Sequence, residues 1–444
     1  NGILLSEIVS GPNTIFHWKT KHPIAAYLIA IGVTNYVYYS DYVPLTATDS
    51  IQVLNYVYPE NLVSAQSLTP DIINVIKLYD SLTILYPFAD EKYGHAQFGW
   101  GGGMEHQTMS FVVSFNHSLI AHECAHQWFG DHVTCGSWED IWLNEGFATY
   151  FEGLTEERYF PSTWQAWKQG KINNITSSPA GSVLCDDTTN VSRIFSGRLT
   201  YDKGSYLLHM LRWELGDNLF FQSLKNYLNA PGIADNYAKT PTFKAQLEAT
   251  SGQNFTTFFD QWYYKQGFPS YQVLWGQTGS AVNVTINQTQ SDASVSFFEM
   301  SVPIKFIGAT QDTTVVFNHT FSGQSFAATI GFPIVSVQFD PQLWILSANN
   351  TVTGIADLKL INDNILVYPN PISNTVSVML NLKEKSDMTF EIFDITGRKV
   401  SSETQNINVG NSVKTIDSSK LSKGSYEIKI TGKDIHFSQK LIKQ

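Results

Sequence analysis

Two histidines and a glutamate stand close together at a spacing that suits metal chemistry. In the segment His122-Glu123-Cys124-Ala125-His126 the imidazoles are four positions apart. Positions i and i+4 share one face of a helix, so both rings can reach one ion. Glu123, one step from the first histidine, can contact a water molecule at that ion without ligating the metal. We therefore predict a helix that binds a metal through His122 and His126.

Glu145 is the predicted third ligand. It ends the segment Trp138–Glu145, which has helical character, and the 18 residues 127 to 144 separate it from His126. That interval is long enough for one helix to end and a second to return to the same ion. Two neutral nitrogens and one carboxylate leave a fourth position open, which is the arrangement of catalytic rather than structural zinc. We predict one Zn²⁺ per chain, with Glu123 as the general base of a hydrolytic reaction.

The elements around this site divide the chain into several parts. Residues 1–45 alternate apolar and aromatic positions and are interpreted as the last strands of an N-terminal β domain that begins outside this chain. Within them, the apolar stretch 25–33 predicts a buried strand. Helical periodicity over 69–86 and over most of 118–268 predicts a mostly helical domain spanning 46–268. Trp138 and Trp142, four apart, are predicted to pack in its core from one helical face.

The character of the chain changes after Pro269. Alternating apolar and polar residues, separated by turns rich in Gly, Asn and Ser, predict a small β-sandwich domain over 269–350. A second β-sandwich domain is predicted over 356–444. The predicted fold class is therefore multidomain α+β, with a helical catalytic domain followed by two small β-sandwiches.

Composition narrows the classes of function. The 444 residues suffice for two to four domains. A net charge of −11 argues against nucleic-acid binding, and no apolar run reaches the roughly 18 residues that suggest a transmembrane segment. The three cysteines, Cys124, Cys135 and Cys185, cannot form a disulfide framework, although one bridge between two of them is compatible with the sequence.

The chain resembles the aminopeptidase N family of gluzincin zinc metallopeptidases, whose catalytic domain is thermolysin-like. The resemblance covers roughly residues 15–345 and rests on the histidine motif and three segments in the same order, Gly102-Gly103-Met104-Glu105-His106, Trp142-Leu143-Asn144-Glu145-Gly146-Phe147-Ala148 and Tyr201-Asp202-Lys203-Gly204. It differs from the family at His106, where the family has Asn, and in the missing N-terminal sandwich domain. His106 is bulkier than Asn and titratable near neutrality, which bears on substrate reach and pH optimum, and it is interpreted as a tolerated variant because Met104 and Glu105 are intact.

This resemblance implies roles for the remaining site residues. The Tyr201 hydroxyl is expected to stabilise the oxyanion of the reaction together with zinc. Gly103, Met104 and Glu105 are expected to contact substrate, with the Glu105 carboxylate binding the free α-ammonium of a peptide through a charge-assisted hydrogen bond. Asn144 is expected to orient the site rather than to touch substrate. The implied function is a zinc-dependent aminopeptidase whose substrates are peptides with a free N-terminus.

Residues 362–444 resemble the C-terminal sorting domain of proteins exported by the type IX secretion system. The matching segments are Tyr368-Pro369-Asn370-Pro371, Phe393-Asp394-Ile395-Thr396-Gly397-Arg398-Lys399-Val400, Leu421-Ser422-Lys423-Gly424-Ser425-Tyr426 and Lys440-Leu441-Ile442. The resemblance implies export through the periplasm to a secreted or cell-surface location, with the type IX machinery as partner. A carbohydrate-binding or structural β-sandwich is the alternative for this domain.

Three alternatives to the aminopeptidase remain. A gluzincin endopeptidase would share the metal site but accept blocked peptides, and Glu105 argues against it. Epoxide hydrolysis at the same metal has no specific support in the sequence. A catalytically inactive surface binding module is disfavoured because His122, Glu123, His126, Glu145 and Tyr201 are all present.

Overall fold

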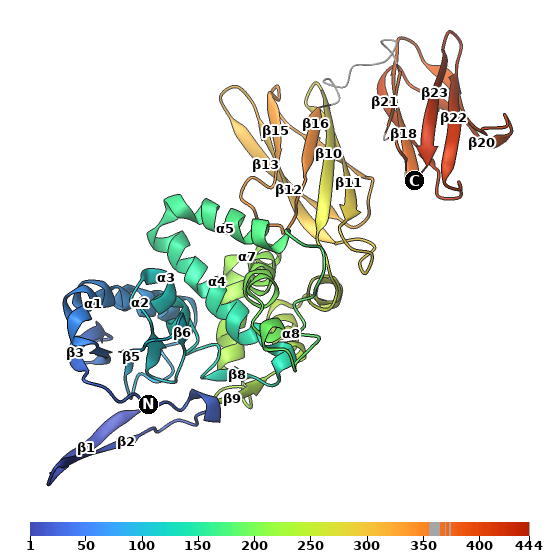
Figure 1. Ribbon diagram of the computed structural model, residues 1–444. Helices are drawn as coiled ribbons and strands as arrows, with labels where there is room; N and C mark the ends of the chain where they lie inside the picture. The colour runs from blue at the N-terminus through green and yellow to red at the C-terminus, as the bar shows by residue number, and fades with distance from the viewer. Residues whose placement is uncertain (355–364, 369, 373, 444) are drawn as a thin grey trace.

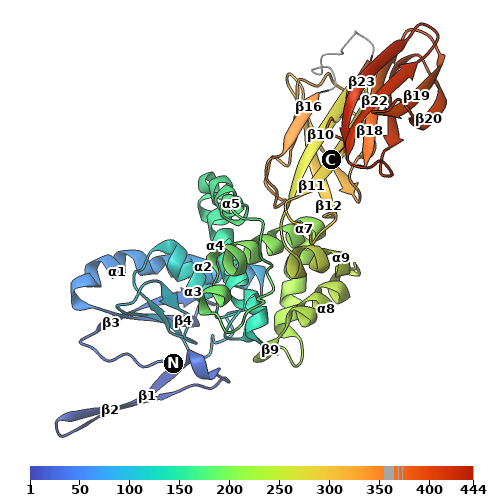
Figure 2. The same ribbon diagram turned by 45° about the vertical axis from the view of Figure 1, so that its right-hand side comes forward.

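The computed structural model describes residues 1–354, 365–368, 370–372 and 374–443, and it is a multidomain α+β protein. Figures 1 and 2 show three parts in a row: a helical part with a mixed sheet, a β part, and a second β part at the C-terminal end. A hairpin of β1 (Ile3–Ser10) and β2 (Asn13–Lys19) projects from the first part. No helix among the described residues is both long and apolar enough to cross a membrane.

A five-stranded sheet supports one side of the helical part. Its order is β3-β4-β5-β7-β6, with β4 parallel to β5, β5 parallel to β7, and antiparallel pairs at both edges. The strands are β3 (Val37–Pro44), β4 (Ser50–Val57), β5 (Tyr93–Gln97), β6 (Gly103–Met104) and β7 (Ser110–Val112). The short edge strand β6 carries the predicted substrate residues. β3 belongs to this sheet although it lies within the predicted N-terminal remnant, 1–45.

The helices lie between β4 and β5 or follow the sheet, and most of their buried side chains form one large core. They are α1 (Leu62–Leu68), α2 (Ile72–Leu82), α3 (His117–Ala125), α4 (Trp142–Tyr159), α5 (Pro161–Ile175), α6 (Val191–Ile194), α7 (Gly204–Asn229), α8 (Thr240–Ser251) and α9 (Thr256–Phe259), with a small parallel pair of β8 (Val133–Cys135) and β9 (Asn236–Ala238). Helix α3 begins where the Asn116 side chain accepts a hydrogen bond from Leu119 N at 3.0 Å.

Two glycines let α4 and α7 approach closely. A Cβ atom on Gly146 would lie 3.0 Å from the Gly204 carbonyl carbon, and one on Gly204 would lie 3.2 Å from Gly146 Cα. Contacts that short are rarely tolerated, so any larger residue would push the helices apart. The close approach sets Glu145, one residue before Gly146, beside the turn that carries Tyr201.

The first β part is a pair of facing sheets. One has the order β14-β11-β10-β16 and the other β13-β12-β15. Their strands are β10 (Pro269–Thr278), β11 (Ala281–Gln290), β12 (Met300–Ile307), β13 (Asp312–His319), β14 (Gln324–Thr329), β15 (Ser336–Phe339) and β16 (Thr351–Gly354). Its buried side chains belong to the same hydrophobic core as the helices. Trp344 stacks on Trp213 and His209 of α7, with ring centroids 5.3 and 4.5 Å apart.

The second β part repeats this architecture with a core of its own. Its sheets have the orders β17-β18-β21 and β20-β19-β22-β23. The strands are β17 (Ile365–Tyr368), β18 (Thr375–Leu382), β19 (Ser386–Asp394), β20 (Lys399–Ile407), β21 (Gly410–Asp417), β22 (Gly424–Thr431) and β23 (His436–Lys443). The predicted start of this domain at 356, and Pro369 of its first motif segment, lie outside the described residues.

The prediction of a buried strand over 25–33 is wrong. The segment contains a single 3-10 turn, Ala26–Leu28, and of its apolar side chains Leu28 is buried whereas Ile31 and Val33 are exposed. Side chains rather than a neighbouring strand bond its backbone: Ala30 N donates to Asn1 Oδ1 at 3.0 Å, and the Leu28 carbonyl accepts from Asn1 Nδ2 at 3.2 Å. Apolar composition therefore predicted a strand where the backbone pairs with no neighbouring strand.

Candidate active site

The three predicted metal ligands converge from two helices. His122 and His126 lie one turn apart around the end of α3, and Glu145 lies in the first turn of α4. Glu145 Oε2 is 3.4 Å from His122 Nε2 and 3.3 Å from His126 Nε2, and the two Nε2 atoms are 3.2 Å apart. Together with a second group, Glu105, Glu123 and His126, these are the sets of side chains among the described residues that could hold a metal ion.

The donor set fits a zinc ion. His126 Nδ1 faces the Phe129 carbonyl oxygen at 3.0 Å. A proton on Nδ1 would be donated to that carbonyl, which leaves the lone pair on Nε2 directed at Glu145 and His122. Two imidazole nitrogens and one carboxylate on one side of an ion are the ligands of a catalytic zinc site with an open position. His126 and Glu145 are almost fully buried, so the site is shielded from bulk water.

Glu123 is buried directly against the edge strand β6. A Cβ atom on Gly103 would lie 2.6 Å from the Glu123 carboxyl carbon, so only glycine leaves room for this carboxylate. Burial raises the pKa of Glu123 well above its usual range, and the charge of His126 opposes the shift. A carboxyl group with a raised pKa is better suited to accept and return a proton than an ordinary surface carboxylate.

Glu105 lies at the end of β6, next to Met104, and its carboxylate is buried at the same site. One of its oxygens is within 4.8 Å of ligand atoms of Glu123 and His126. Gln127, the residue after His126, fixes the backbone here: its Nε2 donates to the Glu105 carbonyl at 3.1 Å and its Oε1 accepts from Thr108 N at 2.7 Å. Burial is the main cause that raises the pKa of Glu105.

Tyr27 is a site residue that the sequence did not reveal. Its hydroxyl lies 3.5 Å from Glu105 Oε1 and accepts a hydrogen bond from Asn144 Nδ2 at 3.3 Å. Asn144 Oδ1 in turn accepts from Cys135 N at 3.0 Å, so Asn144 links the Tyr27 hydroxyl to the backbone of β8. A tyrosine in a segment interpreted as a buried strand gave no signal of this role, and only the observed turn directs it into the site.

Tyr201 lies beside the predicted ligand His122. It belongs to a π-helical turn, Gly197–Lys203, which leads into α7. Its ring is nearly parallel to that of His122, with an interplanar angle of 17° and centroids 5.9 Å apart. Burial, and then the negative charges of Glu145 and Glu105, raise the pKa of Tyr201, so the hydroxyl keeps its proton and can donate it in a hydrogen bond.

His106, the departure from the family pattern, faces away from the predicted ligands. Its Nδ1 lies 3.1 Å from the Leu28 carbonyl oxygen, and its ring packs edge-on against Phe111 at 4.8 Å. Burial lowers the pKa of His106, which favours the neutral ring. In this arrangement the side chain ties the end of β6 to the 25–33 segment. Its expected effect on substrate or pH optimum stays a prediction.

A cavity of about 490 Å³ opens beside the ligands. Its wall includes Met104, Glu105, Asn144 and Glu145, and also Trp138. The prediction that Trp138 and Trp142 pack in the core from one helical face is wrong for Trp138, because it lies in a 3-10 turn before α4 and is 45% exposed. Trp142 is fully buried, as predicted, and donates to Thr240 Oγ1 at 2.8 Å.

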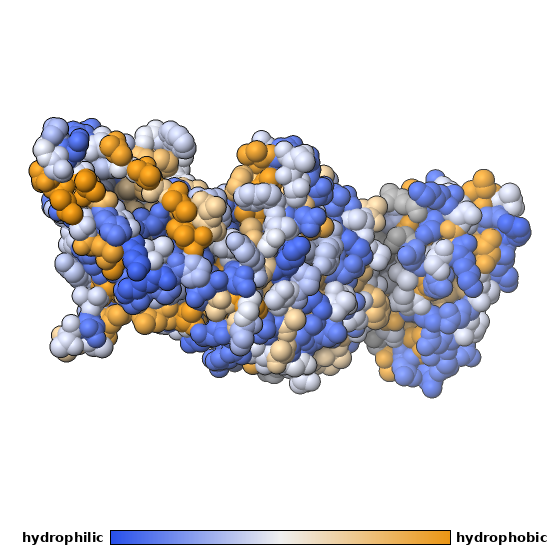
Figure 3. Space-filling model, turned by 90° about the horizontal axis from the view of Figure 1, so that it is seen from below, coloured by the Kyte–Doolittle hydropathy of each residue, from blue (hydrophilic) through white to orange (hydrophobic). Residues whose placement is uncertain are grey.

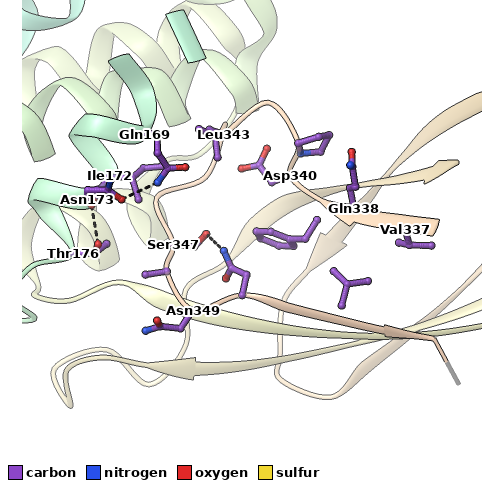
Figure 4. A pocket seen from close by; sticks show the side chains of 15 residues that line it. Gln169, Ile172, Asn173, Thr176, Val337, Gln338, Asp340, Leu343, Ser347 and Asn349 are labelled. Atoms are coloured by element: carbon purple, nitrogen blue, oxygen red, sulfur yellow. Dashed lines mark hydrogen bonds between the residues drawn. The ribbon is translucent and has the colours of Figure 1, made fainter. Parts of the chain in front are cut away.

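A larger cavity, of about 730 Å³, lies where α5 meets the first β part (Figure 4). None of the predicted site residues lines it. Its polar side chains bond to one another, as in the hydrogen bonds from Gln169 to Asn173 and from Asn350 to Ser347. It is therefore part of the junction between the two parts rather than of the candidate site.

Two imidazoles and a carboxylate around an open position, with a buried glutamate beside them, define a candidate metallohydrolase. Comparison with known families is more specific. Residues 105–262 match the peptidase family M1 domain, and residues 366–444 match the secretion system C-terminal sorting domain. The chain is thus similar to the M1 peptidase domain over 105–262 and to a sorting domain over 366–444.

Individual relatives agree with this assignment. The chain is 30% identical to aminopeptidase M1-C of Oryza sativa subsp. japonica over 60% of its own length and 32% of that protein. It is 26% identical to glutamyl aminopeptidase of Bos taurus over 83% of its length and 42% of that protein. Among solved structures it is similar in fold to aminopeptidase A of Legionella pneumophila, with a TM-score of 0.67 and 14% identity over 80% of this chain and 42% of that one. The chain therefore spans a third to two fifths of the length of these relatives.

Proposed function

We propose that this chain acts as a zinc-dependent aminopeptidase. The observation that carries the proposal is the buried Glu105 carboxylate, which lies within 4.8 Å of ligand atoms of Glu123 and His126. A carboxylate so close to the reacting centre can bind a free α-ammonium, and so places the first peptide bond of a substrate at the metal. The M1 relatives and the fold support the same conclusion.

His122, His126 and Glu145 would hold the zinc ion, one per chain. When bound, zinc supplies a Lewis acid that polarises the scissile carbonyl and makes water a nucleophile near neutral pH. The chain's own residues do the rest. Glu123 accepts the proton of the attacking water on its carboxylate and returns it to the leaving amine. Tyr201 Oη donates a hydrogen bond to the developing oxyanion, which is worth on the order of 100-fold or more in rate.

Residues on and directly after the edge strand β6 position the substrate. Glu105 binds the ammonium, while Gly103 and Met104 on the edge strand β6 present backbone to the extended peptide. Buried carboxylates bind an ammonium strongly because neither partner is screened by bulk water. The same charge disfavours a blocked, extended chain, and this argues against the endopeptidase alternative.

The proposal also includes the domain boundaries and the cellular location of the protein. We assign 46–268 to a thermolysin-like catalytic domain, with 1–45 before it and a β-sandwich over 269–350 after it. The match of residues 366–444 to a sorting domain indicates secretion. We infer passage through the periplasm, recognition of the 356–444 domain by the type IX machinery, and a secreted or cell-surface location.

The test compares cleavage of aminoacyl nitroanilides that have a free amine with cleavage of their N-acetylated forms by the zinc-loaded protein. We expect cleavage of the free-amine substrates alone, abolished by a chelator and by Glu123→Gln. Metal analysis of the wild type should give one zinc per chain. Equal cleavage of acetylated substrates would favour the endopeptidase, and no cleavage by a folded, zinc-loaded protein would favour a binding module.

A further inference from the structure

The 490 Å³ cavity continues from the predicted ligands toward the protein surface. Glu105 and Glu145 form its inner end. If Glu105 binds the ammonium and the scissile carbonyl lies at the metal, the Cα of the first residue lies between them. The side chain on that Cα then has this cavity beside it. The position of the cavity thus follows from the proposed function, whereas its selectivity depends on the other lining residues.

Three polar side chains of the wall, those of Thr134, Ser137 and Asn144, are already hydrogen-bonded within the protein. Thr134 Oγ1 donates to the Gly130 carbonyl at 2.6 Å, and Ser137 Oγ donates to Asp140 Oδ2 at 2.9 Å. Asn144 is engaged with Cys135 N and Tyr27. A polar substrate side chain placed against these three residues would lose its water without gaining a free partner from them, which is unfavourable.

Charge is confined to the inner end. Among the described residues that line the cavity, Glu105 and Glu145 are the acidic ones, and none carries a positive charge. Burial raises the pKa of Cys135 to about 12, so its thiol is neutral. An acidic substrate side chain would find no cation among the lining residues, and two carboxylates. A basic one would find no carboxylate beyond the two already assigned to the ammonium and the metal.

Aromatic rings form the outer wall. Trp138, Phe195 and Tyr237 come from three different elements, and each is more than 40% exposed. The rings of Trp138 and Phe195 meet edge to face with centroids 6.0 Å apart. Large aromatic side chains left open to solvent around a cavity gain most when another apolar surface covers them.

We infer that this cavity receives the side chain of the substrate's N-terminal residue and selects large apolar and aromatic side chains over acidic and basic ones. This inference rests on the proposed aminopeptidase function. The unoccupied faces of Trp138 and Phe195 attract an apolar substrate side chain. A charged substrate side chain is disfavoured because the described lining offers it no opposite charge. A volume of about 490 Å³ accommodates phenylalanine, tyrosine or leucine side chains.

The first experiment measures kcat/KM of the zinc-loaded protein on nitroanilides of Phe, Tyr, Leu, Ala, Lys and Glu. We expect Phe, Tyr and Leu to exceed Glu by about 100-fold or more, the usual effect of desolvating an unpaired charge. Lys should be intermediate, because its long stem can return the ammonium to water. Cleavage of Glu or Lys substrates at rates equal to or above that of Phe would overturn the inference and leave the aminopeptidase intact.

Substitutions at Trp138 test whether this ring determines the selectivity for the substrate's N-terminal side chain. Trp138→Ala should lower kcat/KM on Phe about 10-fold while changing Ala substrates little, because only the large side chain reaches this ring. Trp138→Phe keeps an aromatic face and should restore most of the Phe activity. Tyr264→Ala removes an exposed aromatic side chain that does not line the cavity, and it should have no effect. An equal loss on Phe and Ala substrates in Trp138→Ala would contradict a role in selectivity.

A binding measurement separates this inference from the proposed chemistry. Titration calorimetry of the Glu123→Gln variant with the dipeptides Phe-Ala and Glu-Ala reads affinity without turnover. We expect binding of Phe-Ala and none of Glu-Ala at the same concentrations. If the wild type cleaves nothing but this preference holds, the proposed activity fails and the cavity assignment stands. Equal affinities would refute the assignment.

Discussion

At the scale of single residues, the site depends on carboxylates that the fold keeps out of water. Glu105 and Glu123 are buried with His126, and burial raises the pKa of both carboxyl groups. A residue that contacts one of these carboxylates can therefore affect activity even when it does not contact the metal. Tyr27 is the clearest case, because its hydroxyl lies between Glu105 and Asn144.

Tyr27→Phe tests whether this hydroxyl positions Glu105. Its loss removes two long hydrogen bonds, one to Glu105 and one from Asn144, so we expect KM for free-amine substrates to rise about 5-fold with a smaller change in kcat. Zinc content should not change, because Tyr27 is not among the potential ligands. Tyr38→Phe, at an exposed position on β3, is the matched control. A fall in kcat at constant KM would assign Tyr27 to the chemical step instead.

At the scale of elements, periodic patterns were predictable and irregular segments were not. The i, i+4 histidines imply a helix, and α3 provides it, with Glu145 returning on α4. The alternating residues after Pro269 imply strands, which the two facing sheets confirm. The 25–33 segment and Trp138 were predicted wrongly because short turns set their direction. A turn of three residues has no period from which its exposed side could be inferred.

The edge strand β6 lies so close to Glu123 that a larger residue at position 103 should lower activity. Gly103→Ala places a methyl group 2.6 Å from the carboxyl carbon of Glu123, so that the carboxylate must move. Displacement of a catalytic group by about 1 Å can cost on the order of 100-fold, and we expect kcat/KM to fall by that amount. The melting temperature should change little, because the strand is short and only half-buried.

Gly101→Ala is the matched control for this substitution. It lies in the same turn, its φ angle is not positive, and a Cβ there meets no atom within 4 Å. Its activity should stay near that of the wild type. A comparable loss in both variants would show that the turn, rather than the space beside Glu123, controls the rate.

At the scale of the whole molecule, the three parts are joined differently. The helical part and the first β part share one hydrophobic core, and Trp213 Nε1 donates to the Ser301 carbonyl across their junction at 2.6 Å. The C-terminal β part has a separate core. Hydrophobic side chains are also more prominent around the N-terminal elements than over the C-terminal part on the face shown in Figure 3. In the projecting hairpin, Leu5, Ile8 and Phe16 are exposed.

Separate cores predict separate unfolding and separable functions. A chain ending at Gly354 should keep kcat/KM within about 2-fold of the full chain, because no catalytic side chain and no part of the shared core is lost. Calorimetry should show the disappearance of one transition, that of the C-terminal part, with the other unchanged. Trp344→Ala in the full chain should affect the other calorimetric transition. It removes the ring stacked on His209 and Trp213 of α7, so it should lower the transition of the catalytic part and leave that of the C-terminal part in place. A loss of activity beyond 10-fold on truncation would mean that the C-terminal part supports the catalytic site, and the two cores could then not be treated as independent.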